Sequence, residues 1–116
     1  MSAVGGVSTP PDRSMAQRME ALERANEVRV WRARFRVAVK QAGKREGRAR
    51  IADQLRDPHP NMETMQIGRL LLFAPRVGRR IRDEMLAAVG ASPSRRVGAL
   101  TDRQVRELVK QLERVA

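Results

Sequence analysis

The chain has 116 residues and a formal net charge of +11, from 24 lysines and arginines against 13 acidic residues. This length corresponds to one small domain, and a hydrophobic fraction of 41% allows only a thin core. There is no cysteine, and His59 is the only histidine, which excludes disulfides, thiolate metal sites and histidine clusters. We therefore expect no metal site and no cofactor. His59 lies between two prolines, which is typical of an exposed loop residue.

The excess of positive charge indicates a polyanionic partner, because basic domains usually bind nucleic acid or anionic membranes. No apolar stretch approaches the length of a membrane-spanning helix, and residues 1–13 lack the pattern of a secretory signal. The sequence contains no paired carboxylates, no nucleophile–base set and no Walker motif. We therefore expect a cytoplasmic protein that is not an enzyme and has no membrane or small-molecule partner.

In chain order, residues 1–13 contain turn and coil formers without periodicity, which predicts a disordered N-terminal arm. Residues 14–43 follow a helical pattern, so we predict one long, basic, amphipathic helix that ends near Gly43. Its apolar residues recur at steps of three and four, which predicts one apolar ridge formed by Met15, Met19, Leu22, Ala25, Val28, Trp31, Phe35, Ala38 and Ala42.

A basic row lies beside that ridge, formed by Arg29, Arg32, Arg36 and Lys40. The simplest interpretation is the solvated face of an amphipathic helix. Such faces usually mix charges of both signs, and here only Glu27 provides a local counter-charge. The row therefore predicts a second DNA-contacting surface.

Residues 44–116 are predicted to form four short helices, at 48–56, 66–73, 79–89 and from Thr101 onward. Prolines and Gly90 separate these helices, and Gln104 is placed to complete a capping box with Thr101. No alternating pattern predicts a strand, so the fold class is all-α. The predicted core comprises Ile51, Ala52, Leu55, Ile67, Leu70, Leu71, Phe73, Ile81, Met85, Leu86, Val89, Val105, Leu108, Val109 and Leu112.

A glycine turn at 75–78 leads directly into a helix whose first turn is rich in arginine. A helix N-terminus presents unpaired N–H groups and the positive end of the helix dipole, which makes it an anion site. The alternative is an ordinary connection between two helices whose arginines are only solvated. This alternative is less favoured because no acidic residue lies between Glu63 and Asp83. The predicted DNA-binding residues are Pro75, Arg76, Val77, Gly78, Arg79, Arg80 and Arg82, with Gly78 allowing close approach of the backbone.

Arg95 and Arg96 lie in a second turn, and the sequence leaves two roles open for them. They could contact phosphate or pair with Asp102 or Glu84. The aromatic residues Trp31, Phe35 and Phe73 lie on apolar rows and are expected to be core residues rather than platforms for unpaired bases, which argues against a single-strand binder.

Several blocks of the chain resemble the actinobacterial integration host factor family. These are MQIGRLLL at 65–72, PRVG at 75–78, SRRV at 94–97 and LTDRQ at 100–104, preceded by a basic stretch at 25–34. Their order and spacing match, and the resemblance covers about residues 15–112. PxVG alone is a weak signal, but its combination with the later blocks is specific.

The resemblance implies a long N-terminal helix followed by a compact helix-two-turn-helix domain. It also implies a small nucleoid-associated protein that binds duplex DNA with little sequence preference, bends or compacts it and supports site-specific recombination. By the same resemblance, the residues at 75–78 form the phosphate-binding turn, Arg79 follows it as a basic residue, and Arg95 and Arg96 match paired arginines in the second turn.

We therefore expect a DNA-binding architectural protein that is a monomer in solution. Its expected partners are double-stranded DNA and a recombinase or other DNA-bound protein. The alternative is a structured-RNA or ribosome-associated module, because a small-subunit ribosomal protein has a related helix-two-turn-helix. A third interpretation, a helix that binds a membrane surface or a protein, leaves the turn at 75–82 unexplained.

Overall fold

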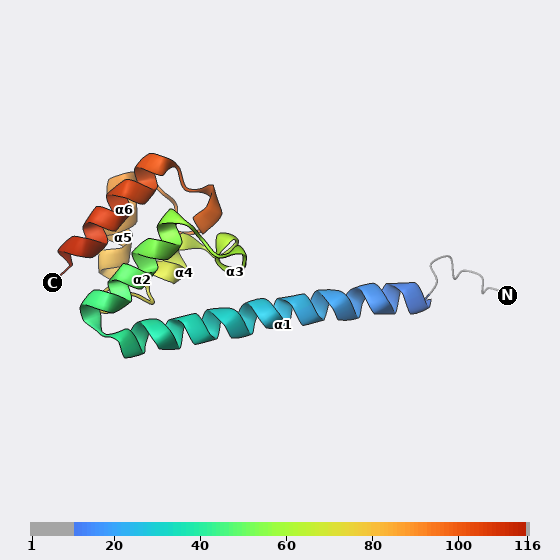
Figure 1. Ribbon diagram of the computed structural model, residues 1–116. Helices are drawn as coiled ribbons and strands as arrows, with labels where there is room; N and C mark the ends of the chain where they lie inside the picture. Colours follow the sequence, from blue (N-terminus) through green and yellow to red (C-terminus); the bar gives the residue numbers. More distant parts are fainter. Residues whose placement is uncertain (1–10, 116) are drawn as a thin grey trace. The chain divides into compact units, whose positions relative to one another are not determined.

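A computed structural model describes residues 11–115 of the chain (Figure 1). Residues 1–10, most of the predicted N-terminal arm, lie outside the described residues. Residues 11–13, which were assigned to that arm, are instead helical. The described part has no β-strand, although one isolated bridge joins Gln66 and Arg96, and the predicted all-α class is confirmed. The elements are α1 (Pro11–Ala42), α2 (Lys44–Arg56), α3 (Pro60–Glu63), α4 (Ile67–Leu71), α5 (Arg79–Val89), the 3-10 helix η1 (Val97–Ala99) and α6 (Asp102–Arg114).

Two stretches of helix were missed by the sequence patterns. Helix α2 begins at Lys44 rather than at residue 48, because Gly43 turns the chain with a φ of 89° and its carbonyl accepts the N–H of Gly47 at 2.7 Å. Helix α3 begins where only a loop was expected. There the exposed His59 caps the helix, with its Nδ1 accepting the N–H of Asn61 at 3.0 Å.

The chain divides into two compact units, Met1–Trp31 and Arg32–Ala116. In the second unit, α2 packs along α6, α5 packs against α6, and α4 packs against α5 (Figure 1). The predicted inward faces of these helices are confirmed, except that Phe73, Ile81 and Val105 are only half-buried. The fully buried side chains are Val39, Ile51, Met62, Met65, Ile67, Leu70, Leu71, Leu86, Val89, Leu108 and Leu112.

In the first unit, the apolar row predicted along α1 is not one ridge. The side chains of Met15, Met19 and Leu22 are 60%, 59% and 63% exposed. The residues that follow, from Leu22 to Trp31, are spaced three apart, and each such step falls about 60° short of a full turn of α-helix. The row therefore winds around the helix instead of following one face.

Gln104 joins the start of α6 to the end of α5. The predicted capping box is confirmed: Thr101 Oγ1 accepts the N–H of Gln104 at 3.1 Å, and Gln104 Oε1 accepts the N–H of Thr101 at 3.0 Å. The buried Gln104 Nε2 also donates to the carbonyls of Val89 at 3.4 Å and Gly90 at 3.5 Å. Gly90 ends α5 in the left-handed conformation, as predicted. One side chain thus satisfies backbone groups at two helix ends.

Gly68, near the start of α4, touches the backbone of Pro93 in the loop after α5. Its N–H donates to the Pro93 carbonyl at 2.9 Å. A Cβ atom on Gly68 would lie 2.8 Å from Pro93 Cβ and 2.9 Å from Pro93 O, closer than packed atoms allow. The adjoining backbone is paired as well, with Ile67 donating to Arg95 at 2.7 Å and Val97 donating to Met65 at 2.9 Å. Only glycine permits this approach of the two segments.

Replacing Gly68 with alanine should lower the free energy of unfolding by about 1–3 kcal/mol, because the added methyl group forces two hydrogen-bonded backbone segments apart. Gly78→Ala is the matched control, since a Cβ there meets nothing within 4 Å. Thermal and urea unfolding followed by circular dichroism would measure both variants. Equal stability of the two variants would contradict this account of Gly68.

Candidate nucleic-acid interface

The first turn, residues 75–78, connects α4 to α5 and is anchored from inside. The Val77 side chain is buried, and its N–H donates to the carbonyl of Ala74 at 3.2 Å. Arg76 has a φ of 70°, in the left-handed region that non-glycine residues rarely adopt. Its side chain is exposed. The turn therefore buries Val77 while placing Arg76 at the surface.

Helix α5 starts with free backbone N–H groups. Gly78 is its N-cap in an extended conformation without a side-chain cap, and the first helical bond runs from Arg82 N–H to Gly78 O at 2.9 Å. Within residues 11–115, the N–H groups of Arg79, Arg80 and Ile81 have no acceptor. The space beside Gly78 is open. These N–H groups and the helix dipole can receive an anion at this point.

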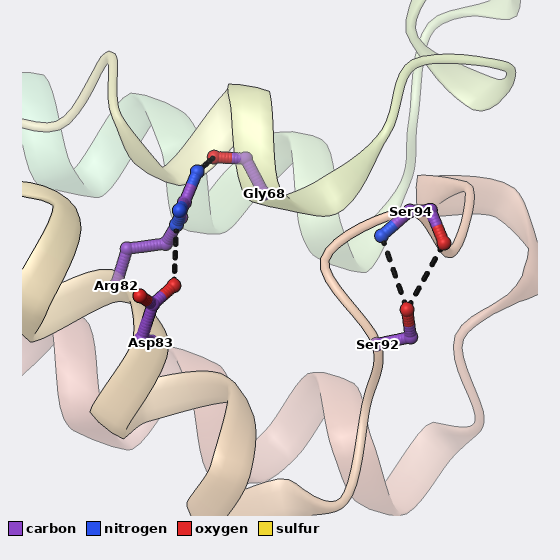
Figure 2. A network of polar contacts seen from close by, with 5 residues as sticks. All are labelled: Gly68, Arg82, Asp83, Ser92 and Ser94. Atoms are coloured by element: carbon purple, nitrogen blue, oxygen red, sulfur yellow. Dashed lines mark hydrogen bonds and ion pairs between the residues drawn. The ribbon is translucent and has the colours of Figure 1, made fainter.

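The arginines around this turn fall into two groups. Arg76, Arg79 and Arg80 are exposed, and none of them forms an ion pair with a described side chain. The Arg82 side chain is only 19% exposed: its Nε lies 2.9 Å from Asp83 Oδ1, and its Nη1 lies 3.5 Å from the carbonyl of Gly68 (Figure 2). Among the predicted arginine contacts of this turn, Arg82 is thus the one whose guanidinium has partners within the described part of the chain.

The second turn follows Gly90 and carries Arg95 and Arg96. Ser92 Oγ accepts the N–H of Ser94 at 3.3 Å and lies 3.0 Å from Ser94 Oγ (Figure 2). Arg95 and Arg96 are exposed, and Arg95 Nε donates to the carbonyl of Ala99 at 3.0 Å. Among the described side chains, neither arginine pairs with Asp102 or Glu84, so the structural pairing considered above is not formed.

The start of α4 connects the two turns. The carbonyl of Gly68 receives Arg82 from the helix that begins at the first turn, and the N–H of Gly68 binds Pro93 in the second turn. Gly68 therefore holds both turns through hydrogen bonds of its backbone carbonyl and N–H groups. Exposed Arg69 follows directly in the sequence and was not among the predicted contacts, although it belongs to the acid-free stretch that marked this region.

The four residues of the predicted basic row on α1 differ in their contacts: Arg32 and Arg36 interact with other residues of the chain, whereas Arg29 and Lys40 are exposed. Arg32 donates from Nε to the Asn61 carbonyl at 2.9 Å and from Nη2 to Thr64 Oγ1 at 2.9 Å. Burial, and then the positive charge of Arg69, lower the pKa of the Arg32 guanidinium. The Arg36 guanidinium lies 5.6 Å from the centre of the Phe73 ring, within cation–π range. Arg29 and Lys40 are exposed.

A further basic site, which no sequence motif marked, is a cavity of about 830 Å³ between α2 and α6. Arg48 lines this cavity, and its Nη1 atom is buried without a hydrogen-bond partner among the described atoms. The only sequence signal for this surface is the charge of α2, whose sequence KREGRARIADQLR holds five basic and two acidic residues. Its basic lining residues are Lys44, Arg45, Arg48, Arg56 and Arg114.

Comparison with known proteins shows a similarity in structure but not in overall sequence pattern to a curated protein or family. No protein-family model matches the chain, and no curated protein matches it. The fold is similar to that of sIHF in its structure bound to an 8-bp palindromic DNA, with a TM-score of 0.63 and 26% sequence identity over 78% of this chain and 98% of that chain. No helix in the described part is long and apolar enough to cross a membrane. The chain therefore has an all-α fold of the sIHF type.

Proposed function

We propose that this protein binds the phosphate backbone of duplex DNA through its two turns and acts as a non-enzymatic architectural protein. The observation that carries the proposal is the start of α5, where three N–H groups have no acceptor among residues 11–115 and adjoin three exposed arginines that form no ion pair with those residues. The likeness to sIHF, whose structure contains DNA, supports the same function.

The geometry suggests how each group acts. The N–H groups of Arg79, Arg80 and Ile81 cap phosphate oxygens, as helix N-termini do for anions. Arg76, Arg79 and Arg80 neutralise the neighbouring phosphates, with their guanidinium groups able to bind two oxygens at once. Contacts of this kind position the protein but read no sequence. Binding is accordingly expected to be largely independent of sequence.

The second turn extends the same surface. Because Gly68 holds both turns, Arg95 and Arg96 contact phosphates at a fixed spacing from the first turn, and Arg82 keeps that spacing while remaining at the edge of the site. Both turns lie in one copy, so a monomer suffices for binding. In this proposal Arg29 and Lys40 form the accessible part of a second contact row on α1, while Arg32 and Arg36 position the helix.

Bending and compaction of DNA follow in this proposal from neutralising phosphates unevenly around the duplex. Such a protein would reside in the nucleoid and could assist a recombinase at a bent site, as the family resemblance implies.

Gly78→Ala should weaken DNA binding about tenfold, which corresponds to about 1.4 kcal/mol, because the methyl group occupies the open space where a phosphate approaches. Its free energy of unfolding should change by less than about 0.5 kcal/mol, since the weaker N-cap is offset by a less flexible unfolded chain. Fluorescence anisotropy with a labelled duplex would measure affinity. Unchanged affinity in a stable variant would place the phosphate elsewhere.

Reversing both charges in Arg79→Glu/Arg80→Glu should raise the Kd for duplex DNA about tenfold or more and reduce the slope of log affinity against log salt by about two. The matched control is Arg106→Glu/Lys110→Glu, which changes the net charge equally at exposed positions of α6. Mobility shifts across a salt series would compare the variants.

An equal loss of affinity in both variants would show a general charge effect and contradict the assignment of the site. A duplex RNA of equal length serves as competitor. If it displaces the DNA at lower concentration than duplex DNA does, the RNA-binding alternative is correct and the proposed function is wrong.

A further inference from the structure

The first half of α1 exposes apolar side chains that neither turn explains. Met15, Met19 and Leu22 are each about three-fifths exposed, and Val30 is 39% exposed. The first three are spaced by four and then three residues, and a further step of four leads to the exposed Asn26. This 4-3-4 spacing assigns them to positions d, a, d and a of a heptad repeat, which share one helix face.

We propose that this face pairs with the same face of a second copy of this chain as a short, parallel, two-stranded coiled coil. Met15, Met19 and Leu22 would each pack against their own counterpart. Asn26 then lies at a position a, where a buried asparagine pairs with its equivalent and fixes a dimer in register, at a cost in stability. This inference does not depend on DNA binding.

The paired face, formed by Met15, Met19, Leu22 and Asn26, is called the seam below. The charges that flank this seam fit the proposed arrangement. Arg18 lies at position g and Glu23 at the following position e, so in a parallel pair each Arg18 faces Glu23 of the other copy. In the single chain both residues are exposed. The described ion pair of this segment, Glu20 with Arg24 at 3.7 Å, falls on the outer positions b and f and does not compete with the seam.

The same charges disfavour other occupants. Between residues 14 and 27 there are two basic residues, Arg18 and Arg24, and three acidic ones, Glu20, Glu23 and Glu27, which gives 2 − 3 = −1. Helices that bind anionic membranes instead carry a lysine- and arginine-rich polar face. DNA is disfavoured for the same reason.

The seam is also short. The next position d is Arg29, and two facing guanidinium groups would repel each other there. The pairing is therefore limited to two heptads and must be weak, because short helical segments are marginally stable. We expect a monomer in dilute solution and pairing where copies are concentrated.

Because the chain has no cysteine, single introduced thiols can report the pairing in the full-length protein. Met15→Cys and Leu22→Cys place a thiol at positions d. Gln17→Cys and Ala21→Cys, also exposed, place it on the outer face. Under a glutathione redox buffer at high protein concentration and without DNA, both seam variants should form disulfide dimers about tenfold faster than the controls, because paired thiols react at a raised effective concentration. Met19→Glu in the Leu22→Cys chain should return the rate to the control level.

Several outcomes overturn the proposal. Equal rates in all four single-cysteine variants would indicate random collision. Trapping at Leu22→Cys without trapping at Met15→Cys would indicate an antiparallel contact. If the seam variants do not exceed the controls while Met19→Glu abolishes flotation with anionic vesicles, the occupant is a lipid surface. Circular dichroism of each variant checks folding, which these exposed positions should leave unchanged.

Discussion

The candidate interface depends on the close backbone contact between Gly68 and Pro93. No other residue type fits at position 68, because a Cβ atom would lie within 2.9 Å of two Pro93 atoms. The contact fixes the loop that carries Arg95 and Arg96 against α4. The Gly68 carbonyl also receives Arg82, which fixes the helix that begins at the first turn. The spacing between the two basic turns is thereby set at Gly68, by one backbone hydrogen bond to Pro93 and one side-chain contact from Arg82.

This arrangement separates arginines that hold the fold from arginines that are free to bind. Arg32 and Arg82 donate to oxygen atoms of their own chain, whereas Arg76, Arg79 and Arg80 face solvent beside free N–H groups at the start of α5. Preorganised donors need little reordering when a phosphate arrives. Composition alone cannot make this distinction, because all of these residues contribute equally to the net charge.

The helices, most of the core and the Thr101 capping box could be predicted because they follow local patterns of period and capping. Helix α3 could not, since its capping by His59 needs a specific side-chain orientation next to prolines that usually break helices. The apolar row of α1 does not form the predicted single ridge, because its repeated steps of three residues wind around the helix. The contacts of Arg32 with Asn61 and of Arg82 with Gly68 could not be predicted either, because these partners are distant in sequence.

The central claim is that duplex DNA meets the backbone at the start of α5 and at the second turn. Titration of the ¹⁵N-labelled protein with a short duplex, followed through backbone amide shifts, tests this claim most directly. The account predicts the largest shifts at Gly78, Arg79, Arg80 and Ile81, accompanied by Arg95 and Arg96. Saturable binding with the largest shifts along the basic cavity between α2 and α6, and none at residues 78–81, would contradict it.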